Sequence, residues 1–86
     1  MELQILATRD IVANVYGQPM FVIHIGQAIR SFGDECKGDP KVSVLAQHPE
    51  DYELWHLGTY EDTTGEIKAL PFQDRKQLAV GANYRT

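Results

Sequence analysis

The chain carries few reactive side chains, and their spacing predicts no catalytic centre. His48-Pro-Glu-Asp51 joins an imidazole to two carboxylates. General acid–base catalysis would also need a cleft that perturbs their pKa values, and no partner nucleophile follows from the sequence. A capped turn is the better interpretation of this segment. Cys36 is expected on an apolar helix face, where a buried cysteine behaves as a small hydrophobic residue. We therefore expect a protein that is not an enzyme.

The sequence supports neither a metal site nor a cofactor site. Structural zinc would need Cys36 together with several of His24, His48 and His56, and none of these pairs has a recognised ligand spacing. The glycines are too widely spaced for a GxGxxG motif, and no GxxxxGK[ST] motif occurs. We therefore expect no bound metal and no cofactor.

Aromatic and basic residues are the side chains to which a binding function can be assigned. Rings can stack on unpaired bases, while cations follow the phosphate backbone. Tyr52, Trp55 and Tyr60 lie on one predicted strand, where strict alternation would place Trp55 on the opposite side from the two tyrosines. Alternatively most rings fill the core, and we expect Phe21, Phe32 and one of Trp55 or Tyr52 there. The candidate cations are Arg9, Arg30, Lys68, Arg75, Lys76 and Arg85.

Charge is distributed unevenly along the 86 residues, whose formal net charge is −4. Residues 34–66 carry nine acidic and two basic residues, a net −7, whereas residues 67–86 carry four basic and one acidic residue, a net +3. The negative total argues against strong non-specific binding to nucleic acid, because counterion release needs a basic surface. The C-terminal excess of cations still permits a local basic face, unless these cations are ordinary solvated residues.

The N-terminal half is predicted to form two strands and a helix. Alternating apolar residues over positions 3–8 indicate a first strand, and the apolar run at 20–25 indicates a second, well-buried one. A helix follows and ends near Gly38. Its apolar residues recur at helical spacing and are Ile25, Ala28, Ile29, Phe32 and Cys36.

The C-terminal half is predicted to form two more strands. Residues 52–60 and 66–70 would pair through a turn in which Gly65 takes a positive φ. Between the helix and this hairpin we expect a strand fragment at 42–45 and a short helical turn at 48–51. Residues 71–86 are expected to form a C-terminal tail that is partly disordered.

This order predicts one small α+β domain over residues 1–70. Its β-β-α-β-β elements would build a mostly antiparallel sheet with one amphipathic helix packed on one face. The other face would be open to a partner. Such a small domain buries only roughly 60–65% of its unfolded surface, so a homodimer would add stability. No stretch approaches the ~18 apolar residues that cross a bilayer, no secretory signal is present, and the single cysteine fits a reducing cytoplasm.

Four stretches of the chain recur in a recognisable order and spacing. They are Arg9-Asp10 with Pro19-Met-Phe21, the segment Gly26–Asp34 that contains AIRSF, HPEDY at 48–52, and LGTYED at 57–62 with Thr64-Gly65. Together they resemble the small nonstructural protein of gokushoviruses, which are microviruses (Microviridae) with circular single-stranded DNA genomes. The resemblance covers roughly residues 3–70.

The resemblance implies a bacteriophage protein of the host bacterial cytoplasm that binds DNA and acts in the synthesis or packaging of the single-stranded genome. It implies no enzymatic activity and supplies no catalytic residues. Gly26, Pro49 and Gly65 are equally well interpreted as residues that specify the fold. Met20 departs from the pattern, since an aromatic residue or proline would be expected beside Phe21.

Two functional hypotheses follow. In the first, single-stranded DNA is bound by the six candidate cations together with Tyr52, Trp55 and Tyr60, with weak sequence preference. In the second, the acidic segment 34–66 binds a basic partner, such as a viral replication or packaging protein or a host factor, and exposed strand edges invite strand addition or dimerisation. An enzyme is the least supported alternative.

Overall fold

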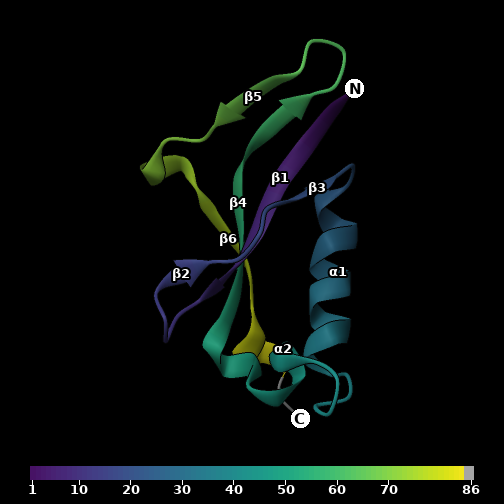
Figure 1. Cartoon of the computed structure of the whole chain (residues 1–86), viewed down its shortest axis with the longest axis vertical. Helices are drawn as coiled ribbons and strands as arrows, with labels where there is room; N and C mark the ends of the chain where they lie inside the picture. The colour runs from purple at the N-terminus through teal and green to yellow at the C-terminus, as the bar shows by residue number, and fades with distance from the viewer. Residues whose placement is uncertain (85–86) are drawn as a thin grey trace.

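The computed structural model describes residues 1–84, which contain a six-stranded antiparallel sheet. Two long strands, β1 (Glu2–Asp10) and β4 (Tyr52–Glu61), pair along its centre (Figure 1). Short strands flank them. The strands β2 (Val15–Tyr16) and β3 (Met20–Val22) pair with β1, and β5 (Glu66–Ala69) and β6 (Lys76–Val80) pair with β4. The mostly antiparallel sheet predicted from the sequence is confirmed.

Helix α1 (Ile25–Cys36) covers one face of this sheet (Figure 1). Its apolar side presents Ala28, Phe32 and Cys36, which pack with Leu6 and Leu54 into the core. Full burial of a side chain such as Phe32 contributes roughly 1.5–3 kcal/mol. The helix predicted from the apolar spacing is therefore confirmed, as is the small α+β class.

A short helical segment connects α1 to β4. Helix α2 (Val44–Gln47) begins after Ser43, whose hydroxyl accepts a hydrogen bond from the amide of Ala46. This N-cap favours helix over the strand fragment expected at 42–45, and that prediction is wrong. The 3₁₀-helix η1 (Pro49–Asp51) follows, with proline at its first position. The helical turn predicted at 48–51 is confirmed.

Strand β3 is shorter and more exposed than the sequence suggested. The run 20–25 was expected to form a well-buried strand, but β3 ends at Val22 and α1 begins at Ile25. Met20, Phe21 and Ile23 are 38%, 47% and 52% exposed. The reason is that β3 is an edge strand paired only with β1, so the prediction of Phe21 as a core residue is wrong.

The C-terminal segment expected to be a tail continues the fold instead. Residues 72–84 form the 3₁₀-helix η2 (Phe72–Asp74), strand β6 and the 3₁₀-helix η3 (Gly81–Tyr84). Strand β6 pairs with the half of β4 that β5 leaves free. The folded domain therefore does not end at residue 70.

Contacts made by this C-terminal segment tie it to the core. Ala79 is buried opposite Leu54, and the Tyr84 ring meets the Phe32 ring edge to face with centroids 6.1 Å apart. A Cβ at Gly81 would lie 1.8 Å from the carbonyl oxygen of Pro49. Only glycine permits this close backbone approach, which joins η3 to η1.

The hairpin between β4 and β5 has the predicted turn, because Gly65 adopts φ of 73°. None of the helices within residues 1–84 combines the length and apolar composition needed to cross a membrane.

Candidate nucleic-acid interface

The register of the strands assigns each side chain to one of two sheet faces, because directly opposed residues of antiparallel strands share a face. Leu6 lies opposite His56 and Thr8 opposite Leu54, on the side that α1 covers. Ala7 lies opposite Trp55 on the other side. No helix within residues 1–84 packs on this second side, and we call it the uncovered face.

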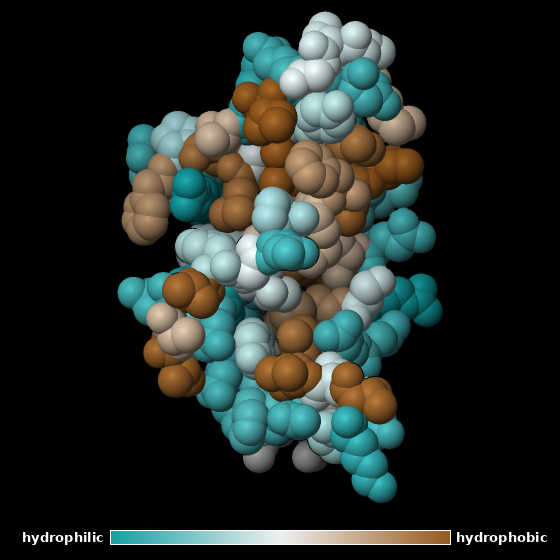
Figure 2. Space-filling view, in the orientation of Figure 1, coloured by the Kyte–Doolittle hydropathy of each residue, from teal (hydrophilic) through white to brown (hydrophobic). Residues whose placement is uncertain are grey.

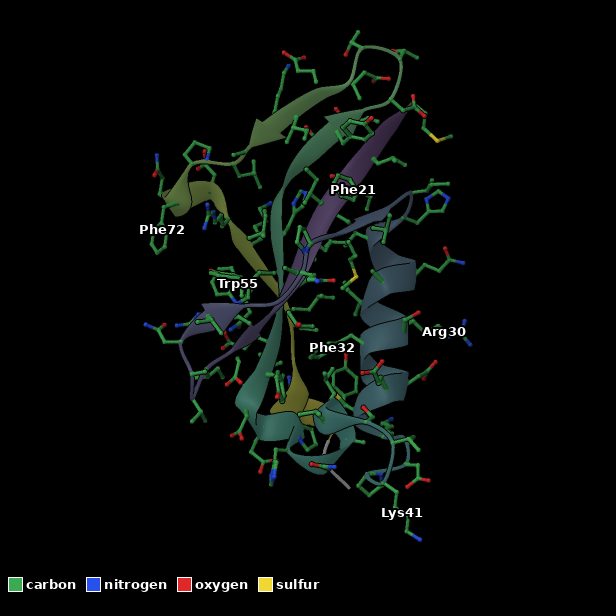
Figure 3. All side chains as sticks on the ribbon, viewed as in Figure 1. Phe21, Arg30, Phe32, Lys41, Trp55 and Phe72 are labelled. Atoms are coloured by element: carbon green, nitrogen blue, oxygen red, sulfur yellow. The ribbon has the colours of Figure 1, made fainter. Side chains whose placement is uncertain are left out.

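Three aromatic residues share the uncovered face. Phe21 lies opposite Ile5 and Tyr60 lies opposite Leu3, and the two rings meet edge to face with centroids 5.4 Å apart. Trp55 continues the row further along β4. Figure 3 shows Trp55 on the side of the strands away from α1, whereas Phe32 lies between α1 and the sheet. We call Phe21, Trp55 and Tyr60 the aromatic platform.

A β-bulge in β4 produces this arrangement. Ile5 pairs with Gly58 and Leu6 pairs with His56, so Leu57 has no partner of its own in β1. The extra residue shifts the alternation of side chains by one position. Trp55 and Tyr60 therefore share a face, contrary to the strict alternation expected from the sequence.

Tyr52 points to the α1 side instead. It lies opposite Asp10 and packs against the core. Burial, followed by the charges of Asp10 and Asp51, raises the pKa of its hydroxyl. Among the three aromatic candidates, Tyr52 is thus the one that the fold separates from the platform.

The carboxylate of Glu53 organises the polar part of the uncovered face. It accepts hydrogen bonds from Nε1 of Trp55 at 2.9 Å and from Nε2 of Gln77 at 2.6 Å. Nη1 of Arg9 lies 3.5 Å from its Oε1, and Arg9 also donates to Oδ1 of Asn14. These contacts fix the indole of Trp55 and hold a guanidinium beside it.

A second exposed ring and cation lie in the loop that joins β5 to β6. Phe72 is 80% exposed, and the guanidinium of Arg75 lies 5.9 Å from the centroid of its ring. Nε of Arg75 is buried and has no hydrogen-bond partner within residues 1–84. Figure 3 places Phe72 at the edge of the sheet, also on the side away from α1.

The remaining predicted cations lie elsewhere. Lys68 is opposite Thr59 and Lys76 is opposite His56, both on the α1 side of the sheet. Lys68 also forms a 3.7 Å ion pair with Glu66. Arg30 points away from the sheet on the outer side of α1 (Figure 3), and Arg85 lies outside the described residues. The structure thus gathers Arg9, Trp55 and Tyr60, with Arg75 at the sheet edge.

Sequence reasoning missed two exposed rings. Phe21 was assigned to the core, and Phe72 was counted among the available rings but was not included in the predicted binding set. The alternation of Met20, Phe21 and Val22 indicates that Phe21 faces away from its neighbours. It does not indicate which face the helix covers, so this signal could not place Phe21 on the uncovered face.

The acidic segment 34–66 leaves the uncovered face largely free of negative charge. Of its nine acidic residues, Glu53 is the one on this face. Glu61, Asp62 and Glu66 lie at the turn between β4 and β5, and the others lie around the ends of α1, α2 and η1. Figure 2 shows most of the apolar residues of this view in its upper middle, smaller apolar groups below, and a hydrophilic lower end.

The other reactive groups offer no competing site. Cys36 is 4% exposed, and burial together with the charge of Glu35 raises the pKa of its thiol. Its interpretation as a small hydrophobic residue is therefore confirmed. Within residues 1–84, no three His, Cys, Asp or Glu side chains are grouped so that they could hold a metal ion.

Comparison with known proteins identifies one family. The model of a family described as Phage ORF5 protein matches residues 3–83, which span every strand of the sheet and α1. The match supports the phage origin that the sequence resemblance implied, while the assignment to gokushoviruses stays a prediction. Searches of curated proteins and of solved structures gave no match.

Proposed function

The chain belongs to the Phage ORF5 protein family, and we propose that it is a non-enzymatic phage protein that binds single-stranded DNA on its uncovered face. The observation that carries this proposal is the shared position of Phe21, Trp55 and Tyr60 on one side of the sheet. Rings presented by strands are suited to stacking on unpaired bases, and stacking tolerates any base.

The geometry of the platform favours stacking. Phe21 is 47% exposed, and the indole of Trp55 is held in place by Glu53. A ring that is already fixed loses little conformational entropy when a base packs on it. Each stacked base contributes about 1–3 kcal/mol, so two bases would contribute about 2–6 kcal/mol.

The electrostatics favour binding that depends more on stacking than on charge. Arg9 and Arg75 are the cations nearest the uncovered face, and each has an acidic neighbour, because Glu53 lies 3.5 Å from Arg9 and Asp74 directly precedes Arg75. Each phosphate contact on a single strand contributes a salt slope of about −0.7, so two contacts would give about −1.4. We propose a binding site with weak sequence preference and a shallow salt dependence.

The resemblance to gokushoviruses suggests where such binding would act. We propose that the protein works in the cytoplasm of the bacterial host, in the synthesis or packaging of single-stranded viral DNA. It would do so by covering unpaired bases, which stack on the rings of the platform.

The test is a titration of a fluorescent single-stranded oligonucleotide at several salt concentrations. We expect micromolar binding, quenching of Trp55 emission and a shallow salt slope. Trp55→Leu should weaken binding by about tenfold, because it removes one stacked base worth about 1–3 kcal/mol. Arg9→Gln should weaken binding and flatten the slope.

Arg30→Gln is the matched control, since it removes the same charge from the outer side of α1. Loss of one positive charge anywhere on the protein weakens its attraction to DNA slightly. Apart from this small effect, Arg30→Gln should bind with the affinity of the wild type. No binding at low salt would overturn the proposal, as would an unchanged affinity for Trp55→Leu.

A further inference from the structure

A groove lies on the opposite side of the molecule from the aromatic platform. A hollow of about 500 Å³ opens between β1, β3, α1 and α2, and we call it the α1 groove. This volume is within the range of protein pockets that bind ligands. Its lining is mainly apolar and includes Met20, Val22, Phe32, Leu45 and Leu54.

One end of the α1 groove is acidic. Glu35, three residues after Phe32 on α1, is part of the lining. Its carboxylate accepts a 3.3 Å hydrogen bond from the Ser43 hydroxyl and forms no ion pair within residues 1–84. An adjoining hollow shares Glu35 and Leu45 and adds Asp39 to the lining. An occupant that matches this surface carries an apolar side chain followed closely by a cation.

The loop between β5 and β6 has this composition. Phe72 projects from it with 80% of its surface exposed, and the guanidinium of Arg75 lies against the ring. Two backbone hydrogen bonds hold the loop in shape, from the amide of Asp74 to Pro71 at 2.8 Å and from that of Arg75 to Phe72 at 3.3 Å. Aromatic residues and arginine are both enriched in protein–protein interfaces.

We propose that the Phe72 loop of one copy of this chain docks in the α1 groove of a second copy. Phe72 would pack on the apolar floor near Phe32, and Arg75 would pair with Glu35. The spacing matches, because the Arg75 guanidinium lies 5.9 Å from the centroid of the Phe72 ring, and residues three apart on a helix, such as Phe32 and Glu35, have Cβ atoms about 5–6 Å apart. The loop cannot fill its own groove, since Figure 3 places Phe72 on the far side of the sheet from α1.

Charge supports a second copy as the occupant. The loop and the strand ends beside it, residues 68–76, carry Lys68, Arg75 and Lys76 against Asp74, a net charge of +2. The α1 groove and the adjoining hollow present the acidic residues Glu35 and Asp39. Because the loop and the groove lie on opposite sides of the molecule, two copies cannot each dock into the other at the same time. The contact is therefore head-to-tail and propagates into a chain or closes into a ring. The rings of the aromatic platform stay exposed in every copy, whereas an Arg75 that pairs with Glu35 is not available to phosphate.

The experiment is sedimentation of the purified full chain from micromolar to millimolar concentration. The wild type should grow in mass with concentration beyond a dimer. Phe72→Ser removes the docking ring, and Met20→Glu places a charge in the groove. Each variant alone should stay monomeric, because every contact needs one loop and one groove.

Mixing the two variants is the decisive step. Phe72→Ser keeps an intact groove and Met20→Glu keeps an intact loop, so the mixture should form a one-to-one heterodimer and nothing larger. Both changed side chains are exposed, and unchanged thermal unfolding of each variant checks that it folds. Val12→Ser removes an apolar side chain that is 77% exposed outside both surfaces, and should associate as the wild type does.

Charge reversal tests the ion pair. Arg75→Glu should weaken association at least tenfold, and Glu35→Arg in the same chain should restore much of it. A wild type that stays monomeric would overturn the proposal and favour a basic partner protein in the groove. A mixture without heterodimer, or a loss of association in Val12→Ser, would overturn it as well.

Discussion

The indole Nε1 of Trp55 donates a 2.9 Å hydrogen bond to Oε1 of Glu53, two positions earlier on the same face of β4. The same carboxylate lies 3.5 Å from Nη1 of Arg9. One acidic side chain thus fixes the central ring of the platform and also occupies the neighbouring guanidinium. A phosphate that approaches Arg9 has to compete with Glu53.

Replacing this carboxylate by an amide should strengthen DNA binding. Glu53→Gln keeps an acceptor for Trp55 but removes the negative charge, so Arg9 becomes free to contact phosphate. We expect severalfold tighter binding to a single-stranded oligonucleotide and a salt slope steeper by about 0.7. Stability should fall by about 1 kcal/mol, because one charged hydrogen-bond acceptor is lost. Anisotropy against salt and urea unfolding measure the two effects, and an unchanged slope would show that Arg9 does not contact DNA.

Two glycine substitutions should have opposite effects on stability. A Cβ at Gly81 would meet the Pro49 carbonyl oxygen at 1.8 Å, whereas a Cβ at Gly26 would meet nothing within 4 Å. Gly81→Ala should lower the free energy of unfolding by about 2 kcal/mol or more, because the backbone of η3 or η1 must move to make room for the new Cβ. Gly26→Ala should raise it by about 0.5–1 kcal/mol, since alanine is the better helix former. Urea unfolding of both variants measures this, and equal effects would contradict the close approach of η3 to η1.

The Glu61 carboxylate should stabilise the fold except in acid. Hydrogen bonds from the Met1 ammonium at 2.6 Å and from Thr63 lower its pKa from 4.5 to about 2. Because the folded pKa lies below the unfolded value, its contribution is present above about pH 4.5 and is lost as the pH falls towards about 2. Glu61→Gln should therefore flatten the decline of the melting temperature over this range. A decline as steep as that of the wild type would argue against the contact.

The N-terminal ammonium should show the reverse dependence. Hydrogen bonds to Asp62 at 2.7 Å and to Glu61 raise its pKa above 8.0. The folded pKa is higher than the unfolded value, so this contribution is complete below pH 8 and is lost as the pH rises through the raised value. Acetylation of the N-terminus removes the charge. In the acetylated protein, the melting temperature should no longer fall with this group as the pH rises. Thermal unfolding between about pH 7 and pH 10 measures this, because the usual pKa of the amine lies in that range.

Cys36 should react only when the protein opens. The thiol is 4% exposed and burial raises its pKa, so both access and the thiolate fraction are low. We expect labelling by an aromatic disulfide reagent at neutral pH to follow the unfolding rate, and to become fast in urea. The Cys36→Ala, Phe72→Cys double variant is the control, because its thiol is at an exposed position. Equal labelling rates for the two proteins would contradict burial of Cys36.

Local patterns were sufficient for the long elements. Alternation over 3–8 predicted β1, and the helical repeat that includes Phe32 predicted α1, because the periodicity of an apolar stripe depends only on backbone geometry. Pro49 likewise marked η1, since its fixed φ suits a first helical position. The phage origin also came from the sequence, through the motifs that resemble a viral family.

Strand β6 could not be predicted in the same way. It begins with the polar residues Lys76 and Gln77, and its five residues become a strand because one half of β4 has a free edge there. Pairing with a distant strand supplies hydrogen bonds that the segment itself cannot form. The prediction of a tail was therefore wrong, because the strand in this segment forms only through its tertiary pairing with β4.

The candidate site also depends partly on the sequence and partly on the tertiary structure. The sequence by itself determined which rings and cations the chain has, where its helix lies, and that one sheet face would remain without a helix. Only the tertiary structure decided that Tyr60 joins Trp55, that Phe21 lies beside them, and that α1 covers the other face. The first outcome comes from the bulge at Leu57, which shifts the alternation by one residue and exists only through the pairing of β1 with β4. The other two come from the pairing of β3 with β1 and from the packing of α1.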